Sequence, residues 1–317
     1  MSGSRIRVGI SSCLLGEPVR WDGGHKRDLF LVSELGRFVE WLPVCPEVES
    51  GMGVPRPSVR LVRDGAEIRM VENKSERDHT RAMRAYSRHR AAELAKQDLC
   101  GYVLKKDSPS CGMERVRVYR AGAPAMRDGR GLFAEALALA MPWLPVEEEG
   151  RLNDAPLREN FIERVFACRR LRDLFEGTWR LRDVVAFHTA HKLQLMAHAP
   201  RSYSELGRLV AGMKRLPRAE LRERYQTGFM AALAKRATPG RNANVLEHMA
   251  GYVSDQLDAA DRAELAALIR DHRLGLVPLV VPLTLIRHHA RRFGIAYLLG
   301  QVWLDPHPKE LMLRNHV

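Results

Sequence analysis

Three cysteines have the chemistry and the placement for a metal or redox site. Cys13, Cys45 and Cys111 each come just after a short apolar segment whose composition is typical of a β-strand. The three segments span residues 6–10, 38–44 and 101–104. Because the carboxyl ends of parallel strands open onto one crevice, we expect the three thiols to converge in space.

The other two cysteines are expected to take no part in this site. Cys100 precedes the third segment and should lie at the opposite edge of the sheet, and Cys168 lies within an apolar helical stretch. Both are expected to be packed free cysteines, which behave as small hydrophobic residues. Five widely spaced cysteines do not resemble a disulfide framework, so we expect a reducing, cytoplasmic location.

Three convergent thiolates admit several chemistries. They could bind zinc with a fourth position open, hold three irons of a [4Fe–4S] cluster and leave the fourth iron open, or form a redox relay. A structural zinc site normally shows close cysteine pairs, and no such pair occurs in the sequence. Single cysteines far apart in the sequence favour a cluster over zinc. On composition alone, the three cysteines could also be unrelated loop residues that form no site.

Side chains near the three cysteines could supply acid–base chemistry. Glu47 lies two residues beyond Cys45, where a carboxylate could act as an acid or base. Ser108 and Ser110 could donate hydrogen bonds to a cluster sulfur or to a substrate. Glu47 could equally form a surface salt bridge, and Ser108 and Ser110 could simply belong to a turn around a proline.

Other residues beside the cysteines are less informative. Asp22 and Arg56 could face the site or water, and Lys105 and Lys106 are expected to be solvated. Glycines around the cysteines would let the backbone approach a bulky ligand. They are Gly16, Gly23, Gly24, Gly51, Gly53 and Gly112.

The elements that position these residues indicate two domains. Residues 1–148 alternate strand-like segments with a polar helical stretch at 75–97, which predicts an α/β domain with a Rossmann-like parallel sheet. Residues 149–317 show helical periodicity throughout and predict an all-α domain. No run of about 18 apolar residues and no signal peptide occur, so we expect no membrane span and no membrane partner. Monomer and dimer both remain open.

The charge of the chain points to an anionic partner. The 317 residues carry a formal net charge of +13. Residues 1–150 hold 24 Lys and Arg against 21 Asp and Glu, whereas residues 151–317 hold 27 against 17. The second half therefore carries most of the positive excess, which favours nucleic acid as the partner.

Several basic and aromatic residues of the second half are candidates for RNA contact. The basic candidates are Lys214, Arg215, Lys235, Arg236, Arg291 and Arg292, together with Arg169, Arg170 and Arg241. Tyr203, Tyr225 and Phe293 could stack on bases. Each basic pair could equally be a solvated helix face, and each aromatic residue could belong to the core.

The motifs around the three cysteines resemble those of the TudS thiouracil desulfidase family. They read SCLLG at 12–16, VRWDG at 19–23, PVCPEV at 43–48 and SPSCG at 108–112, with RGLF at 130–133 similar to a closing Gly-Phe element of that family. The second half is similar to the YbgA-type helical domain. Its matching segments are 146–166, 187–188, 191–193, 196–198 and 203–207. The two-domain arrangement resembles RudS-type desulfidases, which act on 4-thiouridine in tRNA.

This resemblance implies an enzyme with a specific cofactor and substrate. It implies a [4Fe–4S] cluster on Cys13, Cys45 and Cys111, whose open iron captures the substrate's sulfur. It also implies that Glu47 and one serine, Ser108 or Ser110, serve as acid–base and substrate-contact residues. The expected reaction is non-redox removal of sulfur from thiolated tRNA, which gives uridine and sulfide and requires the base to be turned out of the folded RNA.

Two other functions are compatible with the same residues. The chain could desulfurate a free thiouracil base, with the second domain serving assembly. It could also be a non-catalytic RNA-binding protein whose cluster is structural or senses oxidation.

Overall fold

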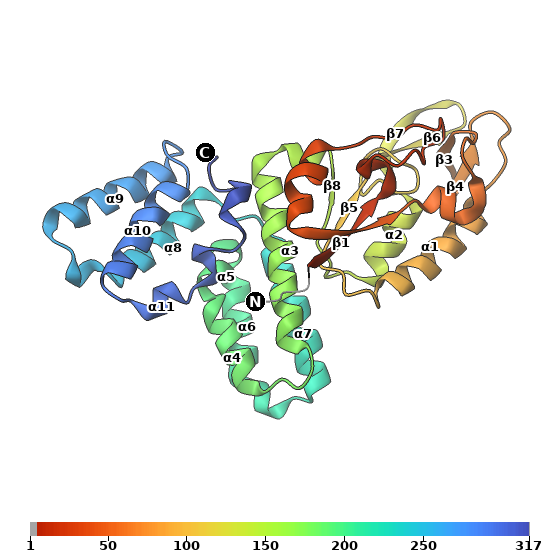
Figure 1. The fold of residues 1–317 in the computed structure, drawn as a ribbon. Coiled ribbons are helices and arrows are strands. Elements are labelled where there is room, and N and C mark those ends of the chain that lie inside the picture. Colours follow the sequence, from red (N-terminus) through yellow and green to blue (C-terminus); the bar gives the residue numbers. More distant parts are fainter. Residues whose placement is uncertain (1–4, 317) are drawn as a thin grey trace. The chain divides into compact units, whose positions relative to one another are not determined.

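The computed structural model describes residues 5–316, and the chain divides into two compact units between Asn153 and Asp154. Figure 1 shows that all strands belong to the first unit, whereas the second is built from helices. The expectation of an α/β domain followed by an all-α domain is therefore confirmed. None of the helices in the described range is long and apolar enough to cross a membrane.

The first unit contains the expected parallel sheet. Its strand order is β2-β1-β5-β8, and every neighbouring pair is parallel. The strands are β1 (Ile6–Ser11), β2 (Val39–Val44), β5 (Tyr102–Leu104) and β8 (Val146–Glu148). Gly9 in β1 is required by close packing, because a Cβ there would lie 2.2 Å from the Tyr102 ring. Most residues of β1 and all of β5 are buried, as in a sheet covered on both faces.

A second, mixed sheet is present that the sequence did not predict. Its order is β4-β3-β6-β7, with β3 parallel to β6 and the outer pairs antiparallel. The strands are β3 (Val59–Asp64), β4 (Glu67–Glu72), β6 (Val116–Arg120) and β7 (Ala123–Gly129). In β6 the exposed Arg117 lies between the buried Val116 and Val118, as in a strand with one covered face.

Two helices of the first unit contribute to the cores of both sheets. They are α1 (Thr80–Leu94) and α2 (Leu132–Ala140). Met83 of α1 and Leu132 of α2 pack against the mixed sheet, whereas Leu94 and Leu137 pack in the core beside the parallel sheet. The helix expected at 75–97 begins at Thr80, because β4 and its turn occupy the preceding residues.

The second unit consists of nine helices with short 3-10 turns between them in the described range. The helices are α3 (Ala155–Phe175), α4 (Leu181–Ala190), α5 (Lys192–His198), α6 (Pro200–Gly212), α7 (Arg218–Leu233), α8 (Pro239–Gly251), α9 (Ala259–Arg273), α10 (Val280–Arg292) and α11 (Ala296–Leu299). Asp154 caps the first helix by accepting a 2.9 Å hydrogen bond from the Leu157 amide. The fully buried Trp303 belongs to the main helical core.

A buried ionic network lies within this helical unit. Glu163 of α3 accepts a 2.7 Å hydrogen bond from Gln194, and its Oε1 lies 3.4 Å from His198 Nε2 and 3.8 Å from Arg314 Nη2. Burial alone would raise the pKa of Glu163, but the charges of His198 and Arg314 lower it well below its usual range. Burial alone would lower the pKa of His198, but Glu163 raises it. The network thus holds a charged carboxylate in the core.

Replacing this carboxylate should destabilise the protein. Glu163→Gln leaves His198 without its buried counter-charge and leaves Arg314 paired only with Glu159, and we expect a loss of about 3–5 kcal/mol in the free energy of unfolding. Because the folded pKa of Glu163 is lowered, its stabilising contribution is present above about pH 4.5 and is lost as the pH falls toward the folded value. The wild type should therefore lose more stability in acid than the variant. Chemical denaturation across this pH range measures both effects, and equal stability of Glu163→Gln and the exposed control Glu223→Gln would contradict the account.

Candidate active site

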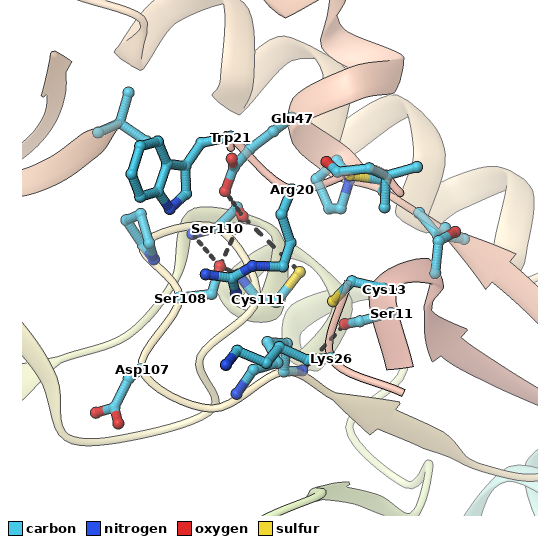
Figure 2. Close-up of a pocket in the computed structure, with 18 of the residues that line it drawn as sticks. Ser11, Cys13, Arg20, Trp21, Lys26, Glu47, Asp107, Ser108, Ser110 and Cys111 are labelled. Carbon is cyan, nitrogen blue, oxygen red and sulfur yellow. Dashed lines mark hydrogen bonds between the residues drawn. The ribbon is translucent and has the colours of Figure 1, made fainter. Parts of the chain in front are cut away.

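The three motif cysteines line one cavity of about 370 Å³ in the first unit. Cys13 lies in a helical turn after β1, Cys45 directly follows β2, and Cys111 lies in the loop after β5. Figure 2 shows the sulfur atoms of Cys13 and Cys111 turned toward the same space. The carboxyl ends of three adjacent parallel strands thus bring together thiols that are far apart in the sequence. Cys100 lies at the opposite end of β5, and Cys168 lies in α3 of the other unit.

The thiols are enclosed and are not joined by disulfides. Cys13 and Cys111 are buried, and Cys45 is partly buried. Burial raises the pKa of Cys13 to about 11, although Lys105 opposes the shift. Burial also raises the pKa of Cys45 and of Cys111, and a hydrogen bond involving Ser11 partly offsets the shift at Cys111. Thiolates in this cavity therefore need a cationic partner, which iron would supply.

The loop that carries Cys111 is fixed by the beginning of α2. The amides of Leu132 and Phe133 donate to the Pro109 and Ser110 carbonyls at 3.1 and 3.0 Å. A Cβ on Gly131 would lie 2.4 Å from the Ser110 carbonyl oxygen, so this close approach requires glycine. The Gly-Phe motif noted in the sequence is therefore the segment that anchors the cysteine loop.

Glu47 is held between an arginine and a serine. Arg56 donates to Glu47 Oε2 from Nε at 3.0 Å and from Nη2 at 2.6 Å, while Ser110 Oγ donates to Oε1 at 2.6 Å. The Arg56 side chain is 3% exposed and also donates to the Val19 and Gly53 carbonyls. The surface salt bridge considered for Glu47 is thus an enclosed pair in the cavity wall. Arg56 orients the carboxylate and leaves Oε1 facing Ser110.

The two serines occupy different positions in the site. Ser110 Oγ lies 2.6 Å from Glu47 Oε1 and 3.8 Å from Cys111 Sγ, so it connects the carboxylate to a cluster-ligand candidate. Ser108 Oγ accepts hydrogen bonds from the Ser110 and Cys111 amides at 3.3 and 3.1 Å. Figure 2 shows this chain of hydrogen bonds along one side of the cavity. Ser108 therefore shapes the loop, whereas Ser110 adjoins the reactive groups.

The cavity also contains residues that the sequence did not assign. Lys105 forms a close ion pair with Glu149 and lines the cavity, so the expectation that it is only solvated was wrong. Glu149, the carboxylate that pairs with Lys105, is 44 residues away in the sequence, so no local pattern predicts this ion pair. Arg20 and Trp21 also line the cavity, and Trp21 is 47% exposed. The VRWDG motif that contains them was the available signal.

The cavity residues fit an iron–sulfur cluster better than a single metal ion. In the described part of the chain, no three Cys, His, Asp or Glu side chains are arranged to hold one metal ion. A cluster would contact each of Cys13, Cys45 and Cys111 through a separate iron, and thiolates are its usual ligands. The enclosed, disulfide-free thiols and the glycine-rich turns beside them suit such a group.

The basic candidates of the helical unit have mixed environments. The exposed ones are Lys214, Arg215, Lys235, Arg236, Arg291 and Arg292. The expectation of RNA contact was wrong for Arg170, which is enclosed and donates to the Pro306 carbonyl at 2.9 Å. Arg169 is paired with Asp173, and Arg241 donates to the His198 carbonyl.

The aromatic candidates of this unit are mostly core residues. Tyr225 is fully buried, and its ring packs against Phe175, Phe187 and Phe229, so the expectation that it stacks on a base was wrong. Phe293 is partly buried against the main helical core. Tyr203 is partly exposed and stacks on His188 with ring centroids 6.0 Å apart.

Comparisons with known proteins match both units. A family described as 2-thiouracil desulfurase matches residues 8–149, and a family of unknown function, DUF1722, matches residues 192–308. The uncharacterized protein YbgA of Escherichia coli strain K12 is 31% identical over 158 residues, which are 50% of this chain and 94% of YbgA. A solved structure of the [4Fe-4S]-dependent thiouracil desulfidase TudS is 32% identical, covers 47% of this chain and 95% of that one, and has a TM-score of 0.38.

The chain belongs to the YbgA family and carries a 2-thiouracil desulfurase domain in its first half. The resemblance indicated by the cysteine motifs and the helical segments is thereby confirmed. The desulfurase domain supports a desulfidase role for the chain.

Proposed function

We propose that this chain is a [4Fe–4S]-dependent desulfidase that removes sulfur from 4-thiouridine in tRNA. The observation that carries the proposal is one cavity that combines three enclosed thiols with the Glu47–Ser110 pair. Cys13, Cys45 and Cys111 would hold the cluster with one iron open. A reducing cytoplasm would keep the three cavity thiols available as ligands, and Cys13, Cys45 and Cys111 form no disulfide in the structure.

The reaction replaces sulfur by oxygen without a net transfer of electrons. One water and the thiocarbonyl group give a carbonyl group and hydrogen sulfide. The bound cluster would supply a soft Lewis acid for the departing sulfur. Glu47 Oε1 is the oxygen that can accept the proton of the attacking water, because Arg56 already occupies Oε2. The Ser110 hydroxyl, 2.6 Å from Oε1, can pass or orient that proton.

The cavity also offers a surface for a pyrimidine ring. The indole of Trp21 lines the cavity and remains half exposed, so it can stack on a base that has been turned out of the RNA. Its neighbour Arg20 lines the same space. Aromatic stacking tolerates a nucleoside within a polymer as well as a free base, so this surface does not by itself select the substrate.

The positive excess of the helical unit favours a polymeric substrate. Residues 151–317 carry 27 Lys and Arg against 17 Asp and Glu, and the six basic candidates named above are exposed there. Contacts to phosphates would offset the cost of turning the base out of the folded RNA, which is a few kcal/mol. A free thiouracil base needs no such surface.

Charge reversal in the helical unit tests the tRNA proposal. The double variant Lys214→Glu with Arg215→Glu should raise the KM for thiolated tRNA about tenfold and make binding less steeply dependent on salt, because two phosphate contacts are lost. The KM for free 4-thiouracil is the internal reference. A double reversal at the exposed Arg88 and Lys96, in the other unit, is the matched control.

The same assay separates the alternatives. Sulfide release from free thiouracil with none from thiolated tRNA would favour the free-base desulfidase. Iron-loaded protein that binds tRNA and releases no sulfide from either substrate would favour a non-catalytic RNA-binding protein.

A further inference from the structure

We propose that the uncovered face of the mixed sheet, next to the active-site cavity, binds the nucleotides that flank the thiolated base. This inference rests on the proposed function, because it describes how a polymeric substrate reaches the same site. It assigns RNA contacts to the first unit, whose overall charge is nearly balanced. The surface is defined by Arg60 of β3, Arg117 and Tyr119 of β6, and Arg127 of β7.

Strand register places these side chains on one face. Leu61 pairs with Val118, and both are buried in the core under α1 and α2. Because side chains alternate across a strand, Arg60, Arg117 and Tyr119 lie on the opposite face. In this arrangement the Arg60 guanidinium lies 5.7 Å from the centroid of the Tyr119 ring.

A groove on this face is continuous with the active-site cavity. The groove has a volume of about 320 Å³ and is lined by the four defining residues together with the loop after β5. Val59, Asp107 and Pro109 line both the groove and the active-site cavity. Asp107 forms a 2.9 Å ion pair with Arg127, which joins the loop of the cysteine site to the mixed sheet. An RNA strand whose thiolated base enters the cavity can therefore continue into the groove.

The chemistry of the groove fits single-stranded RNA. Its lining holds three arginines and one acidic residue, Asp107, and Arg60 also lies 3.3 Å from Glu76 outside the groove. Arg117 is exposed and has no acidic partner among residues 5–316. Tyr119 is 38% exposed, so its ring is available to stack on a base. An exposed aromatic ring with arginines beside it is the combination that binds bases and phosphates of unpaired RNA.

A free base would fill the cavity without reaching this groove. The groove residues should therefore affect a polymeric substrate selectively. We expect Tyr119→Ala to lower the ratio of kcat/KM for thiolated tRNA to kcat/KM for free 4-thiouracil about tenfold, since stacking on one base is lost. Arg117→Glu should lower the ratio by a similar factor, whereas Tyr119→Phe should retain the ratio.

The matched control is Arg88→Glu, an exposed arginine on α1 whose replacement makes the same change in charge. Fluorescence anisotropy with a labelled hexauridylate measures RNA affinity in the full chain independently of desulfuration. We expect Tyr119→Ala and Arg117→Glu to weaken this binding about tenfold, and Arg88→Glu to leave it within twofold of the wild type.

The outcomes distinguish the two proposals. If the wild type desulfurates tRNA, and both groove variants keep the activity ratio and the hexauridylate affinity, the inference about the groove is overturned while the function stands. If no sulfide is released from tRNA but both groove variants bind hexauridylate more weakly, the proposed function fails while the groove remains an RNA-binding surface.

Discussion

Replacing Cys13, Cys45 or Cys111 with serine is expected to abolish sulfide release. Each thiol lines the same enclosed cavity, and each would bind a different iron, so a single loss removes one-third of the protein ligands. Serine is a harder and weaker ligand for iron than cysteine. We expect each purified variant to contain little iron after anaerobic reconstitution and to show no activity above background.

The other two cysteines provide the controls for this experiment. Cys100 lies at the opposite end of β5, and Cys168 lies in the helical unit. Cys100→Ser and Cys168→Ser should keep the iron content and activity of the wild type. Loss of iron with either control, or full iron content in any of the three cavity variants, would contradict the assignment of ligands.

Replacing Glu47 with glutamine should lower kcat by about 10² to 10⁴-fold while the iron content is unchanged. Glutamine keeps the size of the side chain and can still contact Arg56, but its amide cannot accept a proton from water. Since Glu47 is not a cluster ligand in this account, cofactor content separates a chemical role from a structural one.

Glu135→Gln is the matched control, because Glu135 is exposed on α2. Iron analysis, circular dichroism and initial rates on thiolated tRNA should be measured together. If Glu47→Gln retains the wild-type kcat, another group accepts the proton; if it loses the cluster, Glu47 acts by shaping the cavity.

The convergence of the cysteines could be predicted because it depends on strand direction alone. In a parallel sheet, residues that follow neighbouring strands meet at one edge, and Cys13, Cys45 and Cys111 all follow such strands. The contact between Glu47 and Ser110 was not predictable in detail, since 63 residues separate the two positions. Arg56 was equally ambiguous, because only the folded chain shows that its side chain is enclosed.

The mixed sheet shows where sequence periodicity failed. Its strands are rich in arginine, as in the β3 sequence VRLVRD, and this composition resembles a polar loop or a helix surface. Only the fold shows that Leu61 of β3 and Val118 of β6 pack with residues of α1 and α2 while Arg117 stays exposed. The basic composition of the helical unit similarly predicted an anionic partner, but not that Arg170 and Tyr225 would be enclosed.

We expect this chain to hydrolyse the carbon–sulfur bond of 4-thiouridine in tRNA. The most direct test incubates the anaerobically reconstituted protein with thiolated tRNA in oxygen-18 water, without a reductant. Mass spectrometry of the digested RNA and a sulfide assay then follow both products. We expect uridine that carries oxygen-18 and one sulfide for each 4-thiouridine lost. Intact 4-thiouridine in the presence of fully iron-loaded protein, or uridine without the label, would contradict it.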